Sequence, residues 1–199
     1  MPRKSLPRAR IQGNLDGLCG VYAVVNSVRN MSPKRLNGDQ EKDLFRQLIG
    51  MLGEEDRLED ALCNGMTVRP LGRLIDAASS FLQSTHGTRL GRQLAFRTAP
   101  EGLQQFWEAI VEHLDEHGPG SVLLGLGGKH DHWTCVGTMS ENTITLIDSD
   151  GILASIANIV QSPMPKAYGI MCFGRPRHTS CILRSRLIHP AFRSSDVNL

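Results

Sequence analysis

In the first half of the chain, apolar residues recur at three- and four-residue steps, which is the spacing of one buried face of a helix. The first such run starts around Cys19, and Asp16 and Gly17 just before it are suited to cap a helix. Its apolar members are Leu18, Val21, Tyr22, Val25 and Val28. Further runs predict two helices capped by Asp39 and Thr67, and a fourth that starts near Pro100. The fourth ends at the helix-breaking residues 118–120.

The second half contains short apolar runs separated by turn-forming residues, a pattern typical of β-strands. The predicted strands are 121–126, 132–137, 143–147 and 167–173. Their spacing leaves no room for crossover helices, so we expect antiparallel hairpins, with a turn at 140–142 between the second and third strands. In the first half, the charged segment 54–60 is expected to form a connection between two of the predicted helices. Residues 84–95 predict a loop, with a short strand around 94–97 as an alternative.

These patterns predict an α+β protein in which one domain is built as two lobes. A chain of 199 residues suits a single domain. We expect a helical lobe over about 11–118 and an antiparallel sheet lobe over about 119–185. A basic, disordered arm over 1–10 and a polar tail over 186–199 flank this domain.

Composition narrows the classes of function. The chain has 22 Lys+Arg and 20 Asp+Glu, a formal net charge of +2, which gives no case for nucleic-acid binding. No apolar run approaches the roughly 18–20 residues needed to cross a bilayer, and the N-terminus does not resemble a signal peptide. Five irregularly spaced cysteines then indicate reduced thiols rather than a disulfide framework. We therefore expect a cytoplasmic protein without a membrane partner.

Four residues supply the roles that thiol catalysis requires. Cys19 falls in the first turn of a helix, where the helix dipole favours negative charge on the sulfur. His132 starts one predicted strand and Asp148 directly follows the next, so the hairpin brings a base and its orienting carboxylate together. Gln12 precedes the nucleophile by one loop, and its side-chain amide could join the Cys19 N–H in an oxyanion hole.

These motifs and their order resemble the papain-like cysteine peptidases, and most closely the bacterial C39-like branch. The resemblance rests on Gln12, Leu18-Cys19-Gly20-Val-Tyr-Ala, His132-Trp-Thr-Cys-Val and Leu146-Ile-Asp148. It implies a helical lobe that carries the thiol, a sheet lobe that carries the histidine, and a peptide-binding cleft between them. Two departures are the Leu-Cys-Gly-Val-Tyr context of the nucleophile and Ser149, where C39-like members often have proline.

The function that we expect is hydrolysis of a peptide or isopeptide bond in a peptide or protein substrate, through a thioester on Cys19. One alternative passes the thioester to an amine, as in an acyltransferase, deamidase or transglutaminase-like effector. Another is an inactive copy that only binds peptide. No cofactor is implied. A zinc site at the cluster of His130, Asp131, His132 and Cys135 is less favoured, because neighbouring strand residues face opposite sides and no second ligand pair is present.

Overall fold

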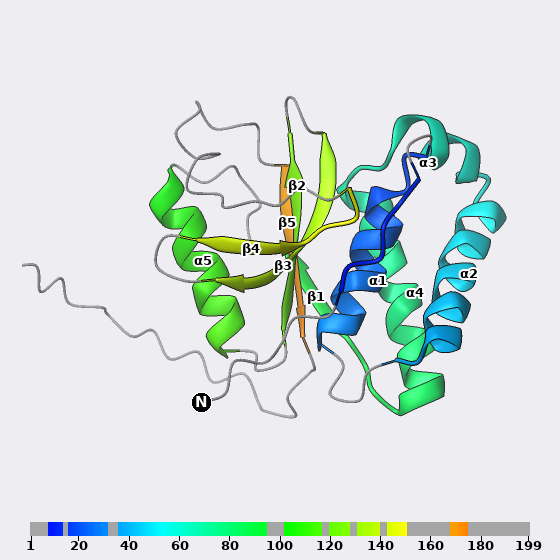
Figure 1. Ribbon diagram of the computed structural model, residues 1–199, viewed down its shortest axis with the longest axis horizontal. Helices are drawn as coiled ribbons and strands as arrows, with labels where there is room; N and C mark the ends of the chain where they lie inside the picture. Colours follow the sequence, from blue (N-terminus) through cyan, green and yellow to red (C-terminus); the bar gives the residue numbers. More distant parts are fainter. Residues whose placement is uncertain are drawn as a thin grey trace, which may run out of the picture.

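The computed structural model describes residues 8–13, 16–31, 36–94, 102–116, 120–127, 131–139, 143–150 and 168–174 (Figure 1). The helices are α1 (Cys19–Met31), α2 (Gly38–Glu54), α3 (Leu58–Asn64), α4 (Val68–His86) and α5 (Leu103–Glu116). The strands are β1 (Gly91–Leu94), β2 (Ser121–Leu126), β3 (His132–Met139), β4 (Ile144–Ile147) and β5 (Tyr168–Gly174). The protein is therefore of mixed α+β class.

The strands form one antiparallel sheet in the order β1-β5-β2-β3-β4. β2, β3 and β4 follow one another as hairpins, as the short connections predict. β5, the last strand in the sequence, lies between β1 and β2. In the β3–β4 pair Cys135 is opposite Ile147, so the start of β3 lies beside the chain that leaves β4. This register brings His132 and Asp148 to the same end of the sheet.

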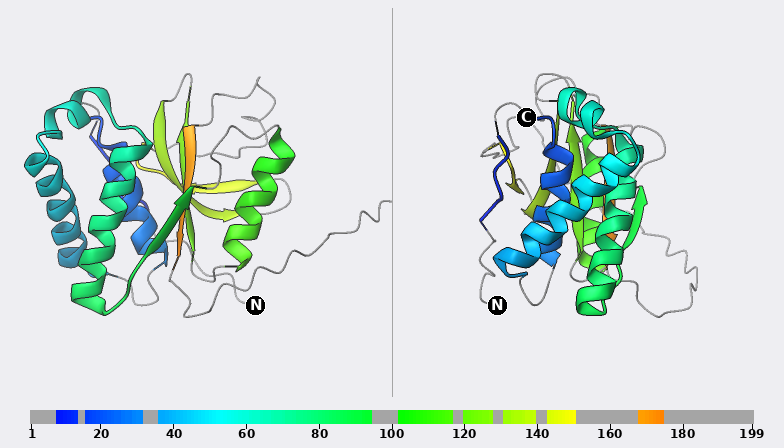
Figure 2. Two further views of the ribbon diagram at one scale, coloured as in Figure 1. Left: turned by 180° about the vertical axis from the view of Figure 1, so that it is seen from behind. Right: turned by 90° about the vertical axis from the view of Figure 1, so that its right-hand side faces the viewer.

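Helices cover both faces of the sheet (Figures 1 and 2). α1 and α4 pack on one face, and α2 packs outside them. α5 lies on the opposite face, where Ile110 joins a separate cluster with residues of β2, β3 and β4. The structure thus differs from the expectation that the helices before residue 118 gather in one lobe. Because alternate residues of a strand face opposite sides, β2 supplies apolar side chains to both layers.

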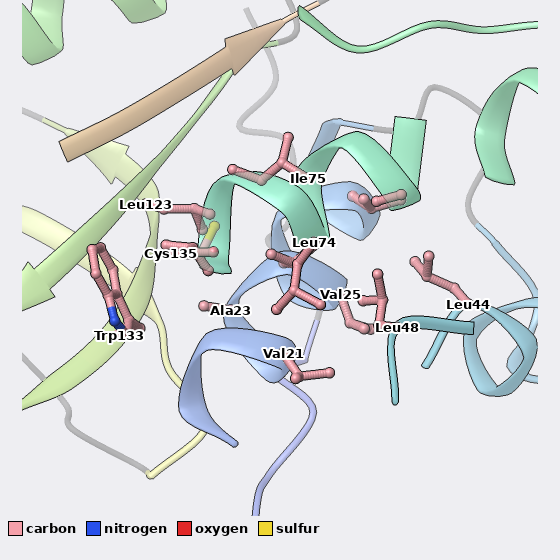
Figure 3. Close-up of a cluster of buried hydrophobic side chains, with 14 of the residues drawn as sticks. Val21, Ala23, Val25, Leu44, Leu48, Leu74, Ile75, Leu123, Trp133 and Cys135 are labelled. Carbon is pink, nitrogen blue, oxygen red and sulfur yellow. The ribbon is translucent and has the colours of Figure 1, made fainter. Parts of the chain in front are cut away.

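The larger core joins α1 to the sheet on one side and to α2 and α4 on the other (Figure 3). Val21, Val24 and Val28 of α1 have no exposed surface. In Figure 3 the labelled side chains run from Leu123 and Cys135 on the sheet to Leu44 and Leu48 on α2. α1 is therefore the central helix of this layer, which holds its N-terminal residue Cys19 firmly against the sheet.

Three local features differ from the sequence-based prediction. The cap of α2 is Asn37, whose side chain accepts hydrogen bonds from the backbone of Asp39 and Gln40, while Gln40 bonds back to Asn37. Asp39 is therefore a first-turn residue. Residues 58–64, within and after the predicted connection, form α3. The predicted loop over 84–95 ends in β1, an edge strand that starts three residues before the alternative strand at 94–97.

The end of the basic arm is fixed to α1. The backbone N–H of Arg10 donates to Asn26 Oδ1 at 2.8 Å, and Asn26 Nδ2 donates to the Arg10 carbonyl. The Arg10 guanidinium and Arg29 both bond to the buried carboxylate of Glu41. Residues 8–10 thus differ from the expected disordered arm. The rest of that arm, the turn at 140–142 and the tail at 186–199 lie outside the described residues.

Candidate active site

The nucleophile candidate opens α1, as its position in the sequence predicts. Cys19 is the first residue of the helix, and 6% of its surface is exposed. Asp16 orders the loop before the helix, because one carboxylate oxygen accepts from the Leu18 N–H at 3.1 Å and the other from the Gly13 N–H at 2.9 Å. These bonds fix the loop that leads to Cys19, whose thiol lies at the N-terminal end of α1 and donates to the Gly17 carbonyl at 3.8 Å.

The base candidate and its carboxylate form a buried pair. His132 Nε2 lies 2.9 Å from Asp148 Oδ2, and both side chains are almost completely buried. The other carboxylate oxygen of Asp148 accepts from the backbone N–H of Asp150 at 2.8 Å. Asp150 therefore helps to hold Asp148 through its backbone N–H. Since Nε2 is engaged with Asp148, Nδ1 is the ring nitrogen left to exchange a proton with a thiol.

Cys19 and His132, which are far apart in the sequence, are brought together by the packing of α1 on β3. Both line the same cleft, and the Cys19 side chain lies close enough to the imidazole to raise its pKa. Burial lowers the pKa of His132, but its hydrogen bond to the Asp148 carboxylate, its interaction with Cys19 and the charges of both groups outweigh burial and raise it to about 10. An imidazole in this setting is positively charged at neutral pH, the state in which it can stabilise a thiolate and donate a proton.

Gln12 lies beside the carboxylate end of this group. Its backbone N–H donates to the Ser149 carbonyl at 3.0 Å, and its side-chain Oε1 accepts from the Ser149 hydroxyl at 3.1 Å. The side-chain Nε2 donates to the carbonyl of Asp16 at 3.3 Å. The amide is therefore turned with its oxygen toward Ser149 and its nitrogen toward the loop that precedes Cys19. Its role in an oxyanion hole stays a prediction.

Ser149 is a residue of this site that sequence reasoning missed. Its residue surface is 1% exposed, and it bonds to Gln12 through both its carbonyl and its hydroxyl. In the sequence it is recognisable only as a departure from the proline expected after Asp148. The structure gives that departure a physical meaning, because proline has no hydroxyl with which to orient the amide of Gln12.

A cleft of about 480 Å³ opens at the Cys19–His132 pair. One wall is the end of the β2–β3 hairpin, and the other is α3 with the start of α4. The lining residues are Cys19, Arg57, Asp60, Asn64, Gly65, Met66, Thr67, Val68, Arg69, Gly125, Leu126, Asp131, His132 and Trp133. Its volume falls within the range of pockets that bind small molecules or a short stretch of peptide.

The wall formed by α3 is attached to both sides of the site. The Gly17 N–H donates to the Leu62 carbonyl at 2.8 Å, and Trp133 Nε1 donates to the Met66 carbonyl at 2.6 Å. Gly17 approaches this wall so closely that a Cβ atom there would lie 2.8 Å from the carbonyl oxygen of Ala61. The sequence contains these residues but no local pattern that pairs them.

Two alternatives can be examined among the described residues. Within these ranges, no group of three or more His, Cys, Asp or Glu side chains is placed to hold a metal ion. His130, one member of the zinc cluster considered from the sequence, lies outside the described residues. None of the helices that the structure describes is both long and apolar enough to cross a membrane.

Comparison with known proteins gave no match, either to a family model, to a curated protein or to a solved structure. The support for a chemical role therefore comes from the residues themselves. It consists of the order of the four motifs in the chain and the contacts that join Cys19, His132 and Asp148.

Proposed function

We propose that this protein is a cysteine hydrolase of the papain-like type, which cleaves a peptide or isopeptide bond through a Cys19-His132-Asp148 triad. The observation that supports this function most directly is the buried chain of contacts from the thiol to the imidazole and on to the carboxylate. A histidine held by a carboxylate and facing a thiol is the arrangement that activates sulfur as a nucleophile.

In the proposed reaction, the Cys19 thiolate attacks the acyl carbon, and the C–S bond forms as the carbonyl π electrons move to oxygen. The oxyanion is stabilised by the Cys19 backbone N–H and, in this proposal, by Gln12. As the tetrahedral species collapses, the C–N bond breaks and imidazolium His132 donates its proton to the leaving amine. Neutral His132 then takes a proton from water, which attacks the thioester and releases the acid and the thiolate.

Thiol alkylation tests the nucleophile without a known substrate. Among the three cysteines whose exposure the structure describes, Cys63 would react first by exposure alone, because it is exposed whereas Cys19 and Cys135 are buried. Burial raises the pKa of the Cys135 thiol to about 11, although a hydrogen bond with Ser121 lowers it, so Cys135 should be inert. The proposal predicts that limiting iodoacetamide modifies Cys19 first in the native protein, as mapped by mass spectrometry.

The matched variants sharpen this experiment. His132→Gln should slow alkylation at Cys19 and leave the rate at Cys63 unchanged, because only Cys19 faces the imidazole. Native protein in which Cys63 reacts fastest would contradict the assignment of the nucleophile.

Cys19→Ala should retain the fold by circular dichroism and release no product from a peptide library. Product that carries an added amine instead of water would assign the acyl-transfer alternative.

A further inference from the structure

Besides the candidate pair Cys19 and His132, four charged side chains line the cleft, and they differ in whether they already have a partner. Arg57 and Asp60 form an ion pair on the α3 wall at 3.3 Å, and Asn64 also donates to Asp60 at 3.0 Å. These two charges largely neutralise each other. Asp131 and Arg69 form no ion pair with any residue in the described part of the chain. A bound molecule therefore meets one available carboxylate and one available guanidinium.

The two available charges come from opposite walls. Asp131 directly precedes His132 at the start of β3, whereas Arg69 is the second residue of α4. They are not paired with each other, although they line one cleft. Asp131 directly precedes the candidate base in the sequence, and both residues line the cleft. Arg69 follows the loop 64–67, whose residues line the cleft as well.

Backbone conformation offers a competing reason for an aspartate at this position. Asp131 has a φ of 36°, in the left-handed region that Asp and Asn tolerate better than most residues. Asparagine would adopt this backbone conformation equally well, but it lacks the negative charge that recognition of a basic side chain requires. This difference makes Asp131→Asn a variant that separates the two explanations.

We propose that the cleft selects an extended peptide that presents a basic side chain to Asp131 and an acidic side chain to Arg69. This inference gives the substrate class of the proposed hydrolase and rests on that proposed function. Complementary charges of this kind fix the direction and register of a bound chain, because a reversed peptide would place like charges together.

Binding to a variant that cannot turn over tests the inference directly. A displayed library of random heptapeptides is selected on the full chain carrying Cys19→Ala, and the bound sequences are read. We expect enrichment of sequences with one Lys or Arg and one Asp or Glu at a constant separation. Neutralising the basic residue of an enriched peptide should weaken its binding about fivefold in fluorescence anisotropy, the size of an exposed ion pair.

A double-mutant cycle then assigns each charge to its partner. In the Cys19→Ala background, Asp131→Asn should abolish the effect of the basic peptide residue, and Arg69→Gln that of the acidic one. Glu59→Gln and Arg89→Gln are exposed charge changes outside the cleft lining and should leave both effects intact. Enriched peptides without charge preference, an unchanged preference in Asp131→Asn, or failure to enrich any peptide would overturn the inference.

A separate measurement tests whether the protein hydrolyses the peptides that it binds. Incubation of enriched peptides with the native chain shows by mass spectrometry whether they are cleaved. Peptides that bind with the expected charge dependence but are never cleaved would refute hydrolysis and leave the charge selection standing. Cleavage of peptides regardless of charge would support hydrolysis and refute the charge selection.

Discussion

The charge on the ring of His132 is set by its neighbours. Burial favours the neutral ring, whereas the hydrogen bonds and negative charges of Asp148 and Cys19 favour the charged ring and prevail. Because the pKa in the folded protein lies above the ordinary value of 6.5, ring protonation favours folding. That contribution is complete below pH 6.5 and is lost as pH rises through about 10.

This balance predicts the titration of one ring. The ¹⁵N chemical shifts of His132 should show a charged imidazole at pH 8, when an ordinary histidine is neutral. Asp148→Asn removes the largest raising influence, the hydrogen bond to the carboxylate, together with its charge, and should move the midpoint to lower pH. Cys19→Ala should move it less far in the same direction. A neutral His132 ring at pH 8 in the native protein would contradict the proposed pairing.

At the scale of single residues, the sequence predicted the positions of those site residues that local structure determines. Cys19 could be placed at a helix start because the apolar period and Asp16 lie next to it in the sequence. His132 and Asp148 could be paired because one hairpin joins their strands. Ser149 could not be recognised as a partner of Gln12, because their contact depends on how the N-terminal segment crosses the end of β4.

At the scale of elements, the short helix α3 is the part of the site that sequence patterns did not indicate. It has seven residues, too few for a helical period to be recognised, and Arg57 provides no side-chain cap. In the structure it contacts the loop before Cys19 through Gly17. Its place as a wall of the cleft is therefore a consequence of tertiary contacts rather than of helix propensity.

Substitutions at two glycines distinguish a glycine required by close packing from one that only adds flexibility to the unfolded chain. At Gly17 a methyl group would lie within 3.0 Å of three backbone atoms of residues 61, 62 and 65, which cannot move independently. Gly17→Ala should lower the free energy of unfolding by roughly 1–3 kcal/mol and slow alkylation of Cys19. At Gly50, in α2, an added Cβ atom would meet nothing within 4 Å beyond its chain neighbours and the backbone of its own helix, so Gly50→Ala should stabilise by about 0.5–1 kcal/mol.

Urea unfolding monitored by circular dichroism measures both effects. Equal stability of the Gly17→Ala and native proteins would show that α3 can shift without loss. In that case the wall would not be a rigid part of the site.

At the scale of the whole molecule, the sheet separates the candidate site from a second core. Cys19, Leu123 and Cys135 belong to the core shared with α1, whereas Ile110 packs with Val122 on the opposite face. The two layers share β2 and β3 and should unfold together, yet only one of them contacts the cleft. Stability and reactivity should therefore respond differently to a change on the α5 side.

Ile110→Ala tests this separation. Ile110 is completely buried, so the substitution should lower the free energy of unfolding by about 2–5 kcal/mol while the native fraction alkylates Cys19 at an unchanged rate. Val111, the next residue of α5, is 37% exposed, and Val111→Ala should change stability by no more than about 0.5 kcal/mol. A slower rate at Cys19 in Ile110→Ala, measured where the protein is folded, would show that the two faces are coupled.

Local patterns were sufficient for the long helices, the β2–β3–β4 hairpins and the order of the four site residues. Each of these depends on residues that are close in the sequence, where apolar period and capping groups act directly. Only tertiary packing placed β5 between β1 and β2, moved α5 to the opposite face, and closed the cleft with α3. The strand and helix placements depend on pairing and packing between distant segments, and the cleft wall depends on contacts such as Gly17 with Leu62 and Trp133 with Met66, which no local sequence pattern indicates.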